Sequence, residues 1–296
     1  MRGNRLKLAA AAVAILLGWL TPTNAQNLGD LLGLGRGGSD NQKGSGQSFP
    51  LEDIIKAGAK TARGTRALSA EEEIAIGRAV AQEIFMRLGP RVEDPGVNGY
   101  VTMVGLAAAK GAIAYKAPYK FTVIHSAQIN AFAAPGGYIF ITTGLLSALR
   151  SEAELAGVLA HEVAHVAHLH MVQAIQRSNR AQGALELSST LLGQDPKMLA
   201  QLAGFVTDTL FTNGLDQRFE FEADSVGVTI AAAAGYDARG LRDFLNTLAS
   251  QEDKADSVFF STHPSIRQRV GLLERNNLPR HGPGQWLKER YTARVR

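Results

Sequence analysis

The sequence contains no cysteine. The chain therefore forms no disulfide and offers no thiolate ligand to a metal. It also lacks the cysteine that anchors a lipoprotein, so any metal site has to use other side chains.

Long apolar runs are also scarce. The apolar run at residues 8–20 is shorter than the roughly 20 residues that a bilayer demands. Three basic residues precede this run, and small residues follow it at Thr23 and Ala25, which is the layout of a secretory signal peptide. We predict that residues 1–25 are a signal peptide, cut after Ala25, rather than a retained membrane anchor.

Net charge almost disappears once that segment is removed. Three basic residues leave with it, so 28 Lys and Arg remain against 27 Asp and Glu. This balance gives no electrostatic reason to expect nucleic acid as a partner, and we predict none.

Composition divides the rest of the chain. Residues 26–68 are rich in Gly, Ser and Asn in their first half, and we expect a flexible linker. Order is expected from Ser69, which forms a capping-box pair with Glu72 at the start of a helix. Residues 69–276 form the expected main domain, and residues 277–296 form a basic C-terminal tail that we expect to be peripheral.

Local patterns predict the elements of the main domain. Two β-branched and aromatic stretches, KFTVIHS (120–126) and YIFITTG (138–144), predict strands on either side of a loop. A capping box at Ser151 predicts a long helix that reaches about Arg177. We expect further helices after Asp94, at about 216–234, and from Pro264.

The long helix contains LAHEVAHVAHLH, residues 159–170. Positions four apart share a helix face, so His161 and His165 direct two imidazoles at one point. Glu162 is rotated about 100° from His161, where it reaches a water on a bound metal but is badly placed as a ligand. In this HExxH pattern two neutral nitrogens bind zinc and the carboxylate takes the proton of the water.

The alternative is a helix whose histidines are ordinary core or surface residues, because HExxH also arises by chance. Apolar flanks predict that this helix is buried, and a buried Glu162 is costly unless a metal and its water pair with it. His168 lies too far along the axis to share the ion. His170 points to the opposite face. We expect both to be structural, with a supporting role behind the ligands left open for His170.

A catalytic zinc needs a third protein ligand. In RFEFEAD, Glu220 and Asp224 share a helix face, whereas Glu222 points about 200° away and is expected to be exposed. We predict Glu220 as the ligand and Asp224 as the acceptor that fixes the tautomer of a ligand histidine. Gly227 continues the same face and would allow a close helix contact. An acidic helix start stabilised by the helix dipole is the alternative, left open for Glu222.

HEVAH followed by EFEAD resembles the HExxH and ExxxD signature of the gluzincins related to the CAAX prenyl protease and HtpX. The match extends to EEEIAIGRAVAQEI, NAFAAPGGYIFITTGLL and THPSIRQRV, and covers roughly residues 69–276. The chain lacks the spanning helices of HtpX-type members. It is similar instead to the soluble exported BepA-like branch, without the C-terminal helical repeat domain.

The resemblance implies an α+β fold, an α-rich zincin with a small mixed β-sheet and an HExxH active-site helix. It implies one Zn²⁺ per chain, bound by His161, His165 and Glu220. Glu162 is then the general base, and Asp224 lies behind the ligands.

The resemblance also implies a substrate site. An edge strand formed by Asn130, Ala131, Phe132 and Ala133 would bind an extended peptide through main-chain hydrogen bonds. His263 matches the late His-Pro motif, where it would contact the metal, the substrate or the developing oxyanion. The alternative for His263 is a helix-start residue before Pro264, and both interpretations stay open.

These residues predict a zinc metalloendopeptidase of the periplasm. The expected substrates are misfolded or unassembled envelope polypeptides, in the service of protein quality control. Peripheral association with the outer membrane or its assembly machinery is left open. The alternatives are an envelope chaperone or adaptor with a latent zinc site, against which Glu162 argues, and a zinc amidase acting on peptidoglycan peptides.

Overall fold

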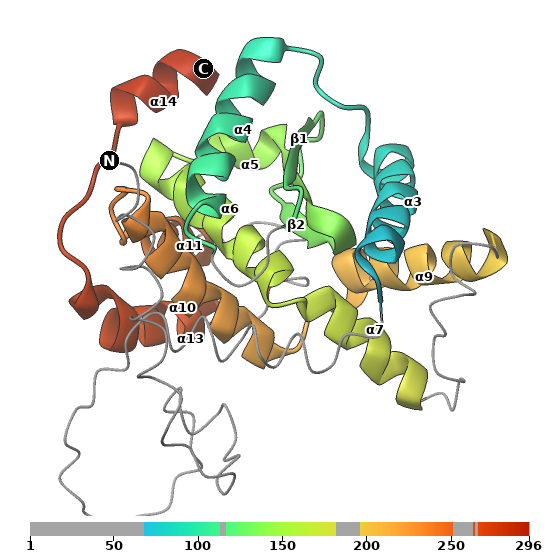
Figure 1. Ribbon diagram of the computed structural model, residues 1–296. Coiled ribbons are helices and arrows are strands. Elements are labelled where there is room, and N and C mark those ends of the chain that lie inside the picture. The colour runs from blue at the N-terminus through green and yellow to red at the C-terminus, as the bar shows by residue number, and fades with distance from the viewer. Residues whose placement is uncertain (1–67, 113–116, 182–195, 251–262, 264–265, 296) are drawn as a thin grey trace, which may run out of the picture. The chain divides into compact units, whose positions relative to one another are not determined.

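The computed structural model describes residues 68–112, 117–181, 196–250, 263 and 266–295 (Figure 1). The predicted signal peptide lies outside this range. Among the described residues no helix is both long enough and apolar enough to cross a membrane. The fold is α+β, as predicted: in the described ranges many helices surround one small mixed sheet.

The sheet has three strands in the order β1-β3-β2. β1 (Lys120–Ile124) pairs in parallel with the central β3 (Tyr138–Thr142), and β2 (Ala131–Ala134) pairs antiparallel to it. The patterns predicted β1 and β3 correctly but left β2 as a loop, because four alanine-rich residues carry little β-propensity. β2 occupies an edge of the sheet, which is the position that the family resemblance implied.

The helices begin and end at residues set by local chemistry. Ser69 and Glu72 form the predicted capping box at the start of α3, and Asp94 caps α4 by accepting from Gly96 N and Val97 N. The helices of the described ranges are α3 (Ala70–Leu88), α4 (Pro95–Ala109), α5 (Thr143–Ala148), α6 (Glu152–Ala167), α7 (His170–Ala181), α9 (Pro196–Asp208), α10 (Gln217–Ala233), α11 (Gly240–Ala249), α13 (Ile266–Leu272) and α14 (Lys288–Val295).

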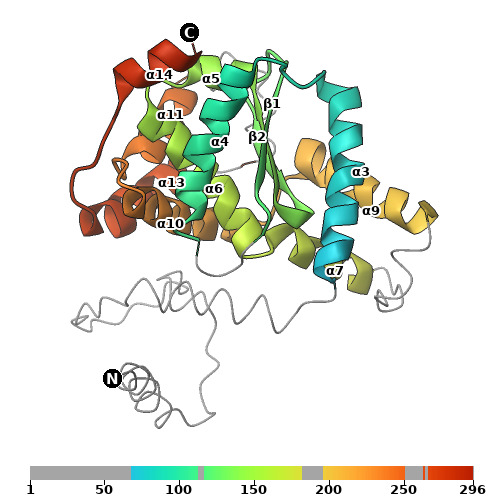
Figure 2. The same ribbon diagram turned by 45° about the horizontal axis from the view of Figure 1, so that its top comes forward.

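The sheet lies between helices α4 and α6 on one side and α3 on the other (Figure 2). Its two faces contribute to two different hydrophobic clusters. Ile139 and Ile141 of β3 face a cluster shared with α4, α6, α10 and α11. Phe132 of β2 and Phe140 of β3 face the other cluster, shared with α3, α7 and α9, and their rings stack at 5.4 Å. The central strand is therefore buried on both sides, and helix α6 runs through the first cluster next to β2.

The predicted long helix from Ser151 is interrupted. α6 ends at Ala167, and Leu169 adopts a positive φ of 54° before α7 begins at His170. A positive φ is uncommon for a residue with a side chain, and it cannot continue a right-handed helix. The turn changes the direction of the chain, so the helical-wheel position expected for His170 is wrong.

A buried carboxylate joins the start of α6 to distant segments. Glu152 is fully buried and accepts hydrogen bonds from the hydroxyls of Tyr100 and Tyr236 at 2.7 and 2.9 Å, and also from the Arg290 guanidinium. The neighbouring Tyr291 is fully buried in the first cluster. The expectation of a peripheral C-terminal tail is therefore wrong for α14, which packs on the domain.

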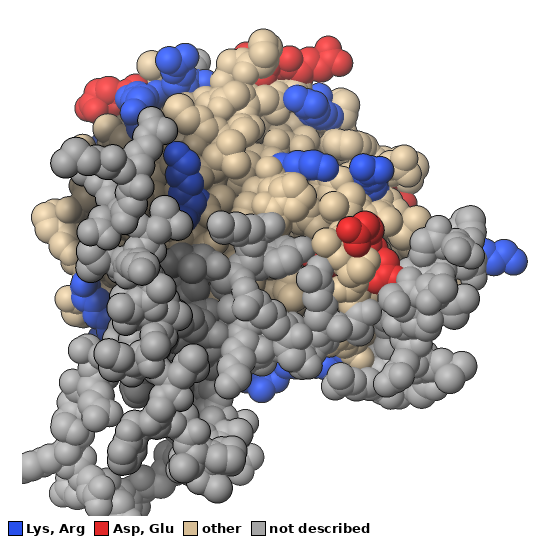
Figure 3. Space-filling model, in the orientation of Figure 1, with Lys and Arg blue, Asp and Glu red and all other residues tan. Residues whose placement is uncertain are grey.

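The functional candidates lie inside the domain. Charged side chains of both signs are spread over the face in Figure 3. By contrast, His161, His165 and Glu220 are each no more than 4% exposed. Helix α10 reaches α6 closely enough to bring them together because Gly227 has no side chain. A Cβ at Gly227 would lie 2.9 Å from the Cα of His161.

Gly227→Ala should therefore destabilise the protein, although alanine favours helices. The added methyl meets the α6 backbone, and overpacking of this kind costs about 1–3 kcal/mol. Gly204→Ala in α9 is the matched control, since a Cβ there meets nothing within 4 Å and should stabilise the helix by about 0.5–1 kcal/mol. Thermal or urea unfolding of both variants measures the difference. Equal stability of the two variants would contradict the close helix contact.

Candidate metal centre

Two ring nitrogens of α6 face each other. The Nε2 atoms of His161 and His165 are 3.0 Å apart, because positions one helical turn apart share a face. Glu220 of α10 completes a triangle with its Oε2 3.6 Å from His161 Nε2 and its Oε1 3.4 Å from His165 Nε2. The structure thus brings together the three residues predicted as ligands.

These separations suit a metal ion. Ligand atoms on a tetrahedral zinc with bonds of 2.0–2.1 Å lie about 3.3 Å from one another. Within the described part of the chain, Glu220 Oε1 is buried and has no hydrogen-bond partner. An unpaired buried carboxylate oxygen is costly, and a cation between the three side chains would satisfy it. The residues present therefore fit a divalent metal such as zinc.

Glu162 lies beside this triangle and is 1% exposed. Neither of its carboxylate oxygens has a hydrogen-bond partner among the described residues. Burial raises the pKa of the Glu162 carboxyl above its ordinary value, against the opposing effect of the nearby histidines. A carboxylate with a raised pKa and free oxygens is suited to taking and returning a proton.

Asp224 lies behind the triangle. Its Oδ1 is 2.9 Å from Nδ1 of His161, the nitrogen that faces away from Glu220. Burial alone would raise the pKa of Asp224, but Arg269 and His161 hold it below its ordinary value. An ionised Asp224 accepts a hydrogen bond from the Nδ1–H of His161, which keeps the proton on Nδ1 and leaves the lone pair of Nε2 available to a metal.

Sequence reasoning missed Arg269 of α13. Its guanidinium is fully buried and donates to both oxygens of Asp224 at 2.8 and 2.7 Å, while Nη1 lies 3.0 Å from Glu220 Oε2. Two signals were available: the arginine lies in the THPSIRQRV match, and it shares the apolar spacing of Ile266 and Leu273.

His263 lies between the triangle and the edge strand. Its Nδ1 is 2.9 Å from Glu220 Oε2, and its Nε2 is 3.2 Å from the carbonyl oxygen of Ala131 and 3.9 Å from Glu162 Oε1. The structure therefore places His263 beside the predicted ligands, which is a location that a helix-start role does not require. Pro264 lies outside the described residues.

The predicted substrate segment 130–133 begins just before β2. The main-chain N–H of Asn130 donates to the hydroxyl of Thr142, and its carbonyl oxygen accepts from the main-chain N–H of Thr142. Ala131, Phe132 and Ala133 lie in the strand. The side chain of Asn130 is fully buried, and both its polar atoms are unpartnered among the described residues. A buried unpaired amide is unusual and calls for a partner, which the described residues do not supply.

Glu222 is buried, not exposed as predicted. It is 8% exposed, and its Oε1 lies 2.6 Å from His168 Nδ1. The prediction failed because a helical wheel of α10 alone does not reveal its neighbours on that side: His168 at the end of α6 and His170 just after the turn at Leu169. His168, as expected, does not belong to the His161 triangle.

The fold and this cluster define a class of protein: helix-rich α+β proteins in which two histidines of one helix and a glutamate of another converge on a metal position. The model of Peptidase family M48 matches residues 95–277. The chain belongs to this family, which confirms the resemblance seen in the sequence and implies a metal cofactor.

Curated relatives agree with this assignment. The putative beta-barrel assembly-enhancing protease of Vibrio cholerae is 31% identical over 69% of this chain and 43% of the relative. The beta-barrel assembly-enhancing protease of Escherichia coli K12 is 27% identical over 77% of this chain and 49% of the relative. The mitochondrial metalloendopeptidase OMA1 of Arabidopsis thaliana is 29% identical over 54% of this chain and 32% of the relative. The chain spans less than half the length of these relatives.

Arg269→Leu should destabilise the metal-free protein by about 3–5 kcal/mol, because it leaves Glu220 and Asp224 buried without their cation. Added zinc should recover part of this loss, since it binds only the folded form and brings positive charge to Glu220. Arg218→Leu is the control, because Arg218 pairs with Asp216 at the surface and should cost less than about 1 kcal/mol. Urea unfolding with and without zinc gives both values. A loss for Arg269→Leu no larger than that of the control would contradict this account.

Proposed function

We propose that the chain is a zinc-dependent metalloendopeptidase. The observation that carries the proposal is the triangle of His161, His165 and Glu220, with the carboxylate of Glu162 beside it, which accepts no hydrogen bond from the part of the chain that the structure describes. A purely structural zinc site closes its coordination with protein ligands and has no use for an adjacent base. Membership of Peptidase family M48 supports the same reaction.

One zinc ion per chain would be held by Nε2 of His161, Nε2 of His165 and the Glu220 carboxylate. When bound, zinc lowers the pKa of a water molecule and polarises the carbonyl under attack. Glu162 takes a proton from the attacking water on a carboxylate oxygen and returns it to the nitrogen of the leaving amine. Asp224 keeps the proton of His161 on Nδ1, and Arg269 balances the charge of Glu220 and Asp224.

The substrate would bind as an extended strand along β2. The edge strand supplies main-chain donors and acceptors, which read a peptide backbone irrespective of side chains. We propose that the amide of Asn130 pairs with the substrate main chain, which would satisfy the two side-chain groups that have no partner among the described residues. His263 adjoins both β2 and Glu220, and we assign it to the same cleft as a contact of the substrate or the oxyanion.

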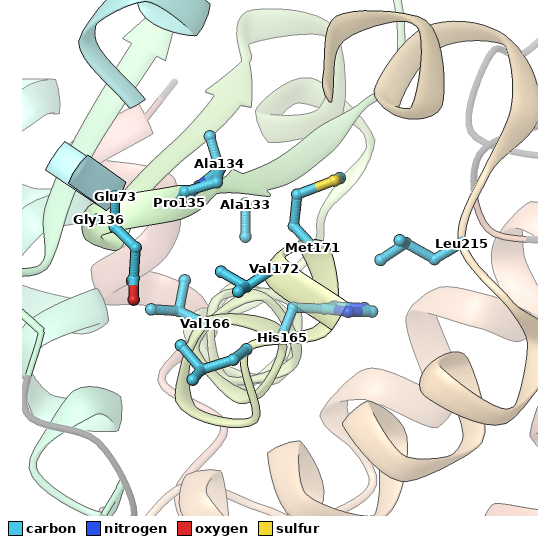
Figure 4. Close-up of a pocket in the computed structure, with 11 residues that line it drawn as sticks. Glu73, Ala133, Ala134, Pro135, Gly136, His165, Val166, Met171, Val172 and Leu215 are labelled. Carbon is cyan, nitrogen blue, oxygen red and sulfur yellow. The ribbon is translucent and has the colours of Figure 1, made fainter. Parts of the chain in front are cut away.

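A small cavity beside β2 would receive one substrate side chain (Figure 4). Its volume is about 20 Å³, and its wall is mainly apolar. The lining includes Ala133, His165, Val166, Met171, Val172 and Leu215. A space of this size, next to His165, favours small apolar side chains close to the cleaved bond.

The proposed setting is the cell envelope. The relatives from Vibrio cholerae and Escherichia coli are named beta-barrel assembly-enhancing proteases, which supports misfolded or unassembled envelope proteins as substrates. We propose export through a signal peptide at residues 1–25, a linker at 26–68, a protease domain at 69–276 and a C-terminal segment at 277–296. Association with the outer membrane or its assembly machinery belongs to the same proposal.

Glu162→Gln tests the reaction. The purified protein should hold about one zinc and cleave casein. The variant should keep the zinc and lose about 10²–10⁴-fold in rate, because the amide takes no proton. Glu274→Gln is the control, since Glu274 lies at the surface and pairs with Arg242. If the native protein and Glu162→Gln both hold zinc and neither cleaves casein, the result favours a latent zinc site. If neither protein holds zinc, the proposed metal site is wrong.

Met171→Ala tests the side-chain cavity. The shortened side chain widens the cavity, so cleavage should shift from peptides with alanine or serine at one position beside the cleaved bond towards leucine or methionine. A single extra methylene is worth about 10–200-fold in such a pocket. Profiling with a peptide library measures the shift, and Met103→Ala, on the exposed face of α4, is the control. An unchanged profile would remove the cavity from the substrate site.

A further inference from the structure

A second cluster of buried groups lies behind His165. His170 Nδ1 is 2.9 Å from His165 Nδ1, and His170 Nε2 is 3.4 Å from Glu222 Oε2. Glu222 also contacts His168 through a separation of 2.6 Å. His168 and His170 are 2% and 0% exposed, so solvent has little access to either ring.

We propose that His170 is a positioning residue for the metal centre: the chain Glu222–His170–His165 fixes the tautomer and the orientation of the ligand His165. The proposal rests on the metal site proposed above. In most metal sites the second nitrogen of a ligand histidine donates to a carboxylate, a carbonyl or a water. Here the imidazole of His170 takes the place of that acceptor.

The positions of the protons determine which group donates and which accepts along Glu222–His170–His165. A neutral histidine that binds a metal through Nε2 carries its proton on Nδ1, so His165 donates to His170. His170 Nδ1 must then be the acceptor, and the proton of His170 lies on Nε2, facing Glu222. Glu222 accepts a hydrogen bond from Nδ1 of His168, and its Oε2 lies 3.4 Å from Nε2 of His170, an electrostatic contact looser than a hydrogen bond. Each of the three imidazoles then carries its proton on one defined nitrogen.

The packing fixes the ring of His170. The ring stacks on Phe219 with a centroid distance of 4.4 Å and an interplanar angle of 13°. Phe219 in turn lies under the guanidinium of Arg177, 4.7 Å from its ring centroid. A stacked ring cannot rotate away from His165 without losing this contact, so the acceptor stays aligned with the ligand.

A second metal bound by His168, His170 and Glu222 is the rival interpretation, and the geometry disfavours it. The 2.6 Å between His168 Nδ1 and Glu222 Oε1 is a hydrogen bond, much shorter than the roughly 3.3 Å between ligand atoms on one zinc. His170 would also need its proton on Nδ1, where it would oppose the proton of His165.

The test compares zinc affinity in His170→Phe and His170→Gln. Phenylalanine keeps the stacked ring but leaves His165 Nδ1 without an acceptor, so the zinc dissociation constant should rise by about 10–100-fold. Glutamine supplies an amide oxygen for His165 and an amide N–H for Glu222, and should restore most of the affinity. His168→Gln is the control, because His168 is equally buried but does not contact His165, and its affinity should stay near that of the native protein.

Two spectroscopic measurements separate positioning from a general loss of structure. The visible absorption of the cobalt-substituted protein should change in His170→Phe and return in His170→Gln. In the zinc-bound native protein, ¹⁵N spectra of labelled histidine should show His165 protonated on Nδ1 and His170 on Nε2. This second measurement decides the question even if His170→Phe fails to fold.

Other outcomes overturn the proposal in distinguishable ways. Native affinity in His170→Phe, equal loss in both His170 variants, or a proton on Nδ1 of His170 would each reject the chain and leave the metal site intact. Two zinc ions per native chain would assign the second cluster to a metal. No zinc in the native protein would reject the metal site and the positioning role together.

Discussion

The close packing of α10 against α6 is the constraint on which the candidate site depends. Gly227 lets the two helices approach, and α10 then presents three acidic side chains in alternate positions to three different targets. Glu220 reaches Nε2 of both His161 and His165, Asp224 reaches the far side of His161, and Glu222 reaches His170 behind His165. One helix therefore supplies a proposed ligand and supports both histidines of the other helix. A shift of α10 along its axis would disturb all three contacts together.

The charges of the buried acidic side chains are consistent with a cation bound among them. Among the described residues of the centre, the carboxylates of Glu162, Glu220 and Asp224 are buried with one guanidinium, that of Arg269. With neutral histidines this set carries two uncompensated negative charges, which a buried site tolerates poorly. A divalent cation matches that deficit. In its absence a proton is the substitute, and Asp224 and Glu220 raise the pKa of His161 to about 9 against the effects of burial and Arg269.

Local spacing predicted much of this site, and distant contacts account for what it missed. His161, His165, Glu220 and Asp224 are paired by single helical turns, so a helical wheel is enough to align them. Glu222 was misjudged because its burial depends on a turn more than fifty residues earlier in the chain. From the sequence alone, Arg269 would be assigned to the surface, because its burial depends on two carboxylate partners on α10. Strand β2 is too short and too rich in alanine for periodicity to reveal it, and only the family resemblance indicated it.

The central strand β3 has a consequence for the whole domain. Its alternate side chains pack into two separate hydrophobic clusters. Both clusters would therefore lose buried contacts if this strand came away. The layer of α3, α7 and α9 therefore cannot unfold and leave the layer of α6 and α10 native, because the shared strand would lose half of its burial. Heating should melt both layers in one cooperative transition, and weakened packing far from the histidines should lower the temperature at which the metal centre is lost.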